Sequence, residues 1–126
     1  MTKTARRGPY VCGVDAAIDV VSGKWKALIL WELYERGTRR FAELRRALPG
    51  VSEKMLAQHL RELEEDSLVR RTVYPEVPPR VEYTLTELGR SLNEALEPLC
   101  EWGMEWIARE GAELLPHEDA PATSRP

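Results

Sequence analysis

The sequence has no hydrophobic run that is long enough to cross a membrane. Its longest apolar stretch, ALIL at residues 27–30, is far shorter than the roughly 20 residues that a spanning helix needs. The basic start of the chain, MTKTARRGPY, leads into no apolar core of the kind that a secretory signal peptide carries. We therefore expect a cytoplasmic protein with no membrane partner.

The sequence is also poor in residues that bind metals or carry out catalysis. Its cysteines are Cys12 and Cys100 and its histidines are His59 and His117, and they lack the spacing of a zinc site. It has no glycine-rich loop that would cradle a phosphate. Nothing suggests a nucleophile beside an oriented base and an oxyanion hole. We expect no metal, no cofactor and no enzymatic activity.

Charge is abundant, and its two signs are unevenly distributed. The chain carries a net charge of −3, and at 43% hydrophobic and 31% charged residues it suits one globular domain. Residues 36–81 hold ten basic and seven acidic side chains, whereas residues 82–126 hold three basic and ten acidic ones. This division suggests that one face meets a polyanion and that another face serves a different contact. We expect a flexible basic arm at residues 1–11, a domain at 12–110 and a disordered tail at 111–126.

Apolar periodicity and turn signals predict five helices and two strands. In chain order we expect them at residues 15–21, 24–36, 41–48, 52–66, 69–74, 81–85 and 87–110. The side chains expected to face inward are Val14, Ile18, Val21, Trp25, Leu28, Ile29, Leu33, Phe41, Leu44, Leu48, Leu56, Leu60 and Leu63. Ser52 is the expected N-cap of the fourth helix, and either Thr86 or Thr84 begins the last one.

The order of these elements predicts a mostly α fold with a small β-hairpin, which is an α+β winged helix-turn-helix. The tight turn LPGVS joins two helices, and the hairpin follows the second of them. The outer face of that second helix carries Lys54, Gln58 and Arg61. In a DNA major groove Gln58 suits adenine, while Lys54 or Arg61 suits guanine or a phosphate. The alternative is a helix face that meets only solvent.

The expected hairpin has a stiff loop within the string VYPEVPPRVEYTL. Pro75, Pro78 and Pro79 restrict the backbone and remove amide donors that would recruit a further strand. We expect Arg80 to project from this wing toward a phosphate or into the minor groove. Glu76, at the tip, either pairs with a wing arginine or faces solvent.

Further basic residues lie close to these elements. Arg70 and Arg71, at the base of the hairpin, are candidates for contacts with the DNA backbone. Lys24 and Lys26, near the start of the second helix, either reach phosphates or are solvated. Four arginines are expected to divide between phosphate contacts and ion pairs, namely Arg39, Arg40, Arg45 and Arg46.

Three strings resemble the HxlR-type winged helix-turn-helix transcriptional regulators, namely GKWKALILWEL, RRFAELRRALPGVSEKMLAQHLRELEEDSLV and RTVYPEVPPRVEYTLTELGRSL. The likeness covers residues 12–107. It implies a homodimer, formed mainly by the N-terminal and C-terminal helices, that binds a pseudo-palindromic operator in double-stranded DNA as a repressor. It also implies a recognition helix over residues 52–66 and a wing around residues 75–80. The expected DNA contacts are Arg39, Arg40, Ser52, Lys54, Met55, Gln58, Arg61 and Arg80.

Cys12 is a candidate redox sensor. Regulators of the HxlR type commonly have a cysteine before the first helix, often followed by proline, and in several of them it senses electrophiles or oxidants. Here Gly13 follows instead. A helix N-terminus and the nearby Arg6 and Arg7 favour a reactive thiolate, and the alternative is a small buried apolar residue. Ser67 is a second departure, because it stands where such regulators usually have a glycine in a turn.

The last predicted helix has a longer apolar side than a lone domain of this size needs. We expect Trp25, Trp31, Trp102 and Trp106 to lie in a dimer interface, the alternatives being the core and a pocket for an aromatic small-molecule effector. Cys100, on the same apolar side, is expected to pack. The acidic, leucine-rich C-terminal half also suits a different class of function, a winged-helix module that binds proteins and never touches DNA.

Overall fold

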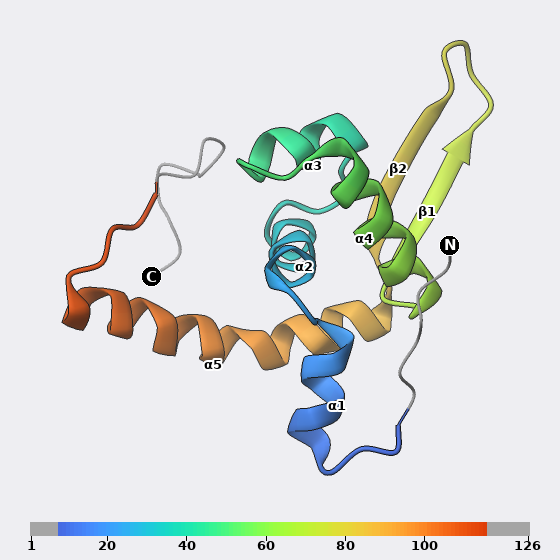
Figure 1. The fold of residues 1–126 in the computed structure, drawn as a ribbon. Coiled ribbons are helices and arrows are strands. Elements are labelled where there is room, and N and C mark those ends of the chain that lie inside the picture. The colour runs from blue at the N-terminus through green and yellow to red at the C-terminus, as the bar shows by residue number, and fades with distance from the viewer. Residues whose placement is uncertain (1–7, 116–126) are drawn as a thin grey trace.

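The computed structural model describes residues 8–115, and these form five helices and one two-stranded antiparallel sheet. The elements are α1 (Gly13–Val20), α2 (Lys24–Arg36), α3 (Phe41–Ala47), α4 (Glu53–Glu65), β1 (Val69–Tyr74), β2 (Arg80–Leu85) and α5 (Glu87–Glu110), as Figure 1 shows. The predicted α+β class is confirmed. The predicted arm and tail lie mostly outside the described residues.

The core forms where α2, α3 and α4 meet the base of the hairpin. Its fully buried apolar side chains are Ile29, Leu30, Leu44, Leu56, Leu60, Leu63 and Val69. The stripes predicted for α3 and α4 are confirmed. In α2 the inward face is rotated from the prediction, because Leu30 is buried and Leu28 is exposed. Residues on a helix are about 100° apart, so a stripe through Ile29, Leu30 and Leu33 turns Leu28 outward toward α5.

Two hydroxyl caps position the helices that matter most for function. The Ser52 hydroxyl accepts the backbone N–H of Met55 at 3.1 Å, which begins α4 as predicted. The Thr86 hydroxyl accepts the N–H of Gly89 at 3.0 Å and donates to the carbonyl of Ser67 at 2.6 Å. Thr86 rather than Thr84 is therefore the cap of α5, and it also ties α5 to the turn after α4.

The turn after α4 requires a left-handed residue. Ser67 has φ +65°, and the amides of Ser67 and Leu68 donate to the carbonyls of Glu64 and Leu63 at 3.0 Å each. This pair of bonds is the Schellman arrangement, in which glycine is usual. A side chain in that conformation costs on the order of 1 kcal/mol, so serine makes this turn less stable than glycine would.

The hairpin is anchored to the helices by a third segment of chain. The strands pair from Val69 opposite Leu85 to Tyr74 opposite Arg80. Arg39, in the loop before α3, adds a short bridge to β2, because its N–H and carbonyl exchange bonds of 2.9 and 2.8 Å with Tyr83. The wing is therefore held against the helix-turn-helix at its base and is free at its tip.

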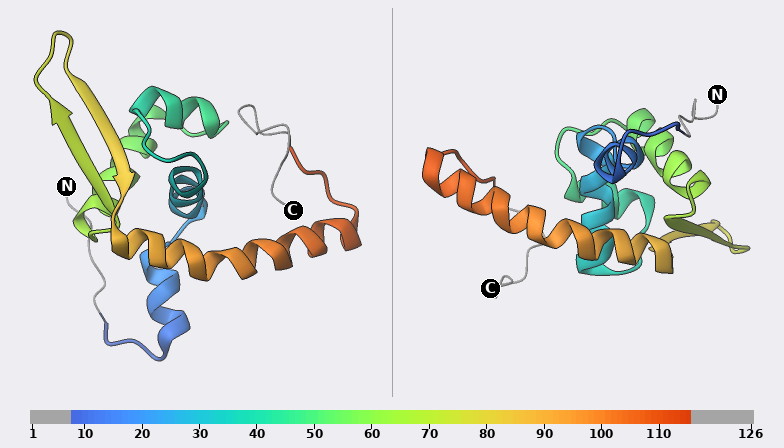
Figure 2. Two further views of the ribbon diagram at one scale, coloured as in Figure 1. Left: turned by 180° about the vertical axis from the view of Figure 1, so that it is seen from behind. Right: turned by 90° about the horizontal axis from the view of Figure 1, so that it is seen from below.

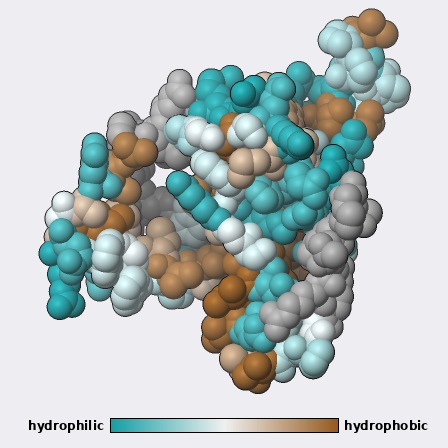
Figure 3. All heavy atoms as spheres, in the orientation of Figure 1, coloured by the Kyte–Doolittle hydropathy of each residue, from teal (hydrophilic) through white to brown (hydrophobic). Residues whose placement is uncertain are grey.

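The helices α1 and α5 keep apolar side chains on the surface. Helix α1 buries none of its residues, and Val14 and Ile18 are exposed rather than inward as predicted. The C-terminal half of α5 runs beyond the core and carries the exposed Leu99, Trp102 and Trp106 (Figures 1 and 2). Figure 3 shows the resulting apolar surface over α1 and along α5. Within residues 8–115, no helix is long and apolar enough to span a membrane.

Candidate nucleic-acid interface

Helix α4 presents its polar face to solvent. Lys54, Met55 and Arg61 are exposed, and Gln58 is half-buried between them. The turn from α3 leads directly into α4, and the hairpin stands beside it (Figure 1). The structure therefore brings together the predicted residues of α4, and it places Ser52 at the N-terminus of α4 as its cap.

A chain of polar contacts runs along α4 into the core. Arg61 Nη1 donates to Gln58 Oε1 at 2.9 Å, and Gln58 Nε2 donates to Glu62 Oε2 at 2.6 Å. The other oxygen of Glu62, Oε1, lies 2.6 Å from Lys26 Nζ. Lys26 is only 3% exposed, so neither role expected for it, phosphate contact or solvated surface, fits.

Lys26 and Glu62 form a buried ion pair in which each charge stabilises the other. Burial raises the pKa of Glu62, but hydrogen bonds from Lys26 and Gln58 and the positive charge of Lys26 outweigh it, so the pKa lies below its usual value. His59 is a neighbour, with Nδ1 3.9 Å from Glu62 Oε1. Burial and the charge of Lys26 lower the pKa of His59, so its imidazole adds no second positive charge at neutral pH.

The arginines before α3 differ in their exposure. Arg40 is exposed, and its backbone N–H donates to Glu43 Oε1 at 2.8 Å. The Arg39 side chain is only 16% exposed, and its guanidinium lies 3.9 Å from Glu32 and 3.7 Å from Glu43. This placement does not suit the phosphate contact expected of Arg39, because the side chain faces carboxylates of its own protein.

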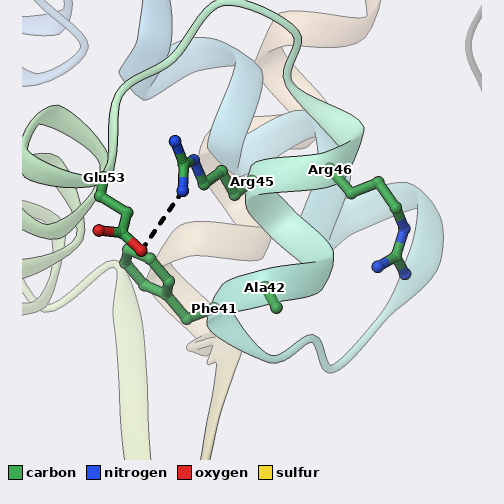
Figure 4. A pocket seen from close by; sticks show the side chains of 5 residues that line it. All are labelled: Phe41, Ala42, Arg45, Arg46 and Glu53. Carbon is green, nitrogen blue, oxygen red and sulfur yellow. Dashed lines mark ion pairs between the residues drawn. The ribbon is translucent and has the colours of Figure 1, made fainter.

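A shallow hollow of about 400 Å³ lies between α3 and the start of α4. Phe41, Ala42, Arg45, Arg46 and Glu53 line it, and Figure 4 shows the Arg45 guanidinium turned toward Glu53 while Arg46 points away. The Arg45 Nη1 atom lies 3.3 Å from Glu53 Oε2. Arg45 therefore forms one of the ion pairs expected for this group of arginines, and Arg46 is exposed, so a phosphate contact by Arg46 stays a prediction.

The wing arginine is folded back onto its own hairpin. Arg80 Nη2 lies 2.9 Å from Glu76, Arg80 Nη1 lies 2.6 Å from Glu82, and the guanidinium stands 3.8 Å over the ring of Tyr74. Hydrogen bonds from Arg80 lower the pKa of Glu76, and those same carboxylates raise the pKa of Arg80. Of the two roles predicted for Glu76, pairing with a wing arginine is confirmed. The tip ends instead in the fully exposed Val77.

A second hollow, of about 310 Å³, separates α4 from the hairpin. It is lined by Ala57, Arg61, Glu64, Arg71 and Tyr83. The exposed Arg71 therefore shares a groove with Arg61 of α4. The sequence identified Arg71 only as a base-of-hairpin candidate, since its proximity to Arg61 depends on how the hairpin packs.

A helix-turn-helix with an adjoining hairpin and an open polar helix face is the winged helix-turn-helix architecture. The family description HxlR-like helix-turn-helix matches residues 20–111. The chain belongs to the HxlR-like helix-turn-helix family. Its members are transcriptional regulators rather than enzymes, and the resemblance found in the three sequence strings is confirmed.

Individual HxlR-like relatives agree with this assignment. The uncharacterized HTH-type transcriptional regulator YtcD of Bacillus subtilis is 49% identical over 100 residues, which is 79% of each chain. Its crystal structure superposes with a TM-score of 0.73, at 47% identity, and covers 79% of this chain and 100% of that one. The oxidized form of the redox regulator HypR has a TM-score of 0.65 at 42% identity, covering 82% of this chain and 100% of HypR. The reduced form of the transcriptional regulator YodB of B. subtilis has a TM-score of 0.60 at 36% identity, covering 79% and 93%.

The two cysteines of this HxlR-like chain both lie on the surface. Cys12 is exposed at the N-cap position of α1, where its side chain makes no capping bond. Cys100 was expected to pack but is exposed, beside an apolar hollow of about 270 Å³ lined by Ala27, Leu28, Trp31, Leu96 and Leu99. Among residues 8–115, no group of three or more His, Cys, Asp or Glu side chains is placed to hold a metal ion.

Proposed function

We propose that the protein is a dimeric, sequence-specific DNA-binding repressor that occupies a pseudo-palindromic operator in the cytoplasm. The observation that carries this proposal is the open face of α4, with Lys54, Met55 and Arg61 exposed beside a groove that Arg61 shares with Arg71. An α-helix fits the major groove of B-DNA, and a helix presented in this way reaches base edges there.

The roles of the side chains follow from their chemistry and exposure. Gln58 is assigned to an adenine, and Met55 to the methyl group of a thymine. Lys54 and Arg61 are assigned to phosphates or to a guanine, and Arg40 to a phosphate. The Ser52 hydroxyl accepts from Met55 but keeps its own proton, so it can donate to a phosphate oxygen while it caps α4.

Arg80 acts on DNA as part of a neutralised cluster. Its guanidinium shares its charge with Glu76 and Glu82, and without it the wing tip would present two unpaired carboxylates to the DNA backbone. We therefore assign Arg80 a role in making the wing acceptable to phosphates, either by direct contact or by masking the carboxylates.

The first test separates the base contact from the backbone contact. Gln58→Ala is expected to relax the preference at one base pair by about tenfold, within the 1–3 kcal/mol usual for a bidentate contact. Arg80→Ala is expected to weaken binding to all sequences alike. Selection of bound duplexes from a random pool, followed by anisotropy titrations at several salt concentrations, measures both.

The wild-type protein is the control for that test. Its affinity is expected to fall with salt by about 0.9 in log K per neutralised phosphate. If the wild type selected no sequence and showed no salt-dependent binding, the repressor proposal would fail. A winged-helix module that binds proteins would then be the better account.

We further propose that Cys12 makes the regulator responsive to oxidants or electrophiles, small molecules that serve as its effector. Cys12 is exposed at the N-cap position of α1, where an oxidant or electrophile in solution can reach its thiol. HypR, a relative at 42% identity, is a redox regulator.

Diamide is expected to release the wild-type protein from its operator, raising the apparent dissociation constant about tenfold or more, a typical coupling between sites. Cys12→Ser is expected to keep its affinity after the same treatment. Cys100→Ser, measured in parallel, shows whether the second exposed thiol takes part. Undiminished release of the Cys12→Ser variant would remove Cys12 from the mechanism.

A further inference from the structure

A buried lysine on α2 contacts the proposed recognition helix, α4, from inside the protein. Lys26, on α2, is only 3% exposed and its amine contacts Glu62 on α4 at 2.6 Å. Taking two charges out of water is costly, and a pair of apolar side chains often stabilises a fold as well or better. A buried ion pair at this place therefore invites a role other than stability.

The two oxygens of Glu62 have different partners. Oε1 meets Lys26, whereas Oε2 accepts the side-chain amide of Gln58 at 2.6 Å. Lys26 thus holds the carboxylate from below, and the carboxylate in turn holds Gln58 on the open side of the helix. Glu62 is 15% exposed, so it reaches Gln58 from beneath the surface that faces solvent.

These contacts determine which way the Gln58 amide points. A carboxylate oxygen only accepts, so Gln58 must turn Nε2 toward Glu62. A guanidinium only donates, so Gln58 must turn Oε1 toward Arg61, whose Nη1 lies 2.9 Å away. One N–H and one lone pair of the amide remain for an outside partner. Those are the two groups that bidentate recognition of adenine uses.

We propose that Lys26 and Glu62 are positioning residues that set the base preference of the protein by orienting Gln58 and Arg61. The inference rests on the proposed DNA-binding function of α4. Neither positioning residue needs to touch DNA. Lys26 is buried beneath α4, where DNA bound to the outer face of α4 would not reach it. A sequence-reading glutamine free to rotate its amide discriminates poorly, whereas one held at both ends presents a single donor–acceptor pattern.

A purely structural role for the pair makes a different prediction. In that case, disturbing Lys26 or Glu62 would change the stability of the contact between α2 and α4 and leave the base preference as it was. The test therefore needs variants that alter the hydrogen bonding of Gln58 while keeping the fold, and it needs two separate readouts.

Glu62→Gln is the first variant, because it is nearly isosteric. The amide oxygen is drawn to the buried ammonium of Lys26, which leaves an amide N–H group facing Gln58 where an acceptor is needed. Gln58 must then reverse or release its amide. Glu65→Gln is the matched control, since it removes the same charge from an exposed position one turn further along α4.

The second variant, Lys26→Met with Glu62→Leu, replaces both charges by apolar groups and keeps the test valid if Glu62→Gln folds poorly. All variants are compared with Gln58→Ala by duplex selection at one salt concentration and by urea unfolding. The side-chain amide signals of Gln58 in ¹⁵N-labelled protein report its environment without DNA.

We expect Glu62→Gln and the double variant to lose about tenfold in discrimination at the base pair that Gln58→Ala relaxes, as expected for loss of one bidentate contact. Glu65→Gln is expected to keep that discrimination, and the Gln58 amide signals are expected to move in the first two variants only. If the Glu62→Gln and double variants fold and keep the base preference of the wild type, the inference is overturned while the proposed function stands. A wild-type protein with no sequence preference would overturn the proposed function and this inference with it.

Discussion

Gly89→Ala is expected to lower the free energy of unfolding by about 3 kcal/mol, the upper end of the usual cost of overpacking. A Cβ atom at this position would lie 2.2 Å from the carbonyl oxygen of Leu68 and 3.1 Å from a methyl carbon of Leu85. The carbonyl cannot move aside cheaply, because it accepts the backbone N–H of Thr86 at 3.1 Å. The first turn of α5 would have to separate from the turn after α4.

Urea unfolding at a fixed protein concentration measures this loss, since the stability of an oligomer depends on concentration. Gly13→Ala is the matched control, because a Cβ at the first residue of α1 meets no atom within 4 Å. We expect it to leave the stability unchanged or to raise it by up to about 1 kcal/mol through helix propensity. Equal unfolding midpoints for the two variants would contradict the close approach at Gly89.

Because of the position of Gly89, the clash would be expected to change the orientation of α5 as well as the stability of the fold. The carbonyl of Gly89 accepts the amide of the fully buried Asn93 at 3.0 Å, and the Thr86 cap spans α5 and the turn after α4. These contacts determine the direction in which α5 leaves the turn after α4. In the proposed dimer, a displacement of α5 at Gly89 would also be expected to change the spacing of the two recognition helices.

Local chemistry was enough to predict much of this fold from the sequence. Helices α2 and α5 begin and end at the predicted residues, Ser52 caps α4 as predicted, and Thr86, one of the two predicted candidates, caps α5. The left-handed Ser67 lies in the turn where the regulators that the sequence resembles usually have a glycine. These features depend on interactions across only a few residues.

The partners of the charged residues could not be predicted in the same way. Lys26 and Glu62 are 36 positions apart, and their ion pair depends on how α2 packs against α4. The sequence predicts a phosphate contact for Arg39, but its backbone bridges to Tyr83 and its side chain lies near Glu32 with only 16% exposure. The need for glycine at residue 89 has no local signal in the sequence, because only the approach of Leu68 makes a side chain impossible there.

Helix α1 shows a second reason why burial could not be predicted fully from the sequence. Its periodic stripe was interpreted as a core face, yet Val14 and Ile18 are exposed in the single chain. Periodicity identifies a face that seeks burial but does not say whether the partner belongs to the same chain. The apolar side of α5 poses the same question, which the oligomeric state answers.

Trp102→Glu combined with Trp106→Glu is expected to turn the proposed dimer into a monomer and to weaken operator binding about 100-fold or more. The two indoles are 62% and 48% exposed on the half of α5 that extends beyond the core. Burying such rings against a second copy removes large apolar areas from water, and a charge in their place opposes that burial. A monomer loses the second half-site, and with it the gain from linking two contacts on one operator.

Ala108→Glu is the control for this variant, because it adds a carboxylate to the same part of α5 without removing an indole. Residues on a helix are about 100° apart, so Ala108 lies roughly 200° around the axis from Trp106, on the opposite side. We expect it to stay dimeric in sedimentation velocity and to bind the operator as the wild type does. A wild-type protein that sediments as a monomer at micromolar concentration would contradict the proposed dimer itself. A tryptophan double variant that remains dimeric would show that α5 is not the dimer interface. In that case, the spacing of the recognition helices would have to be set by another surface, and the exposed stripe of α1 would be the next to test.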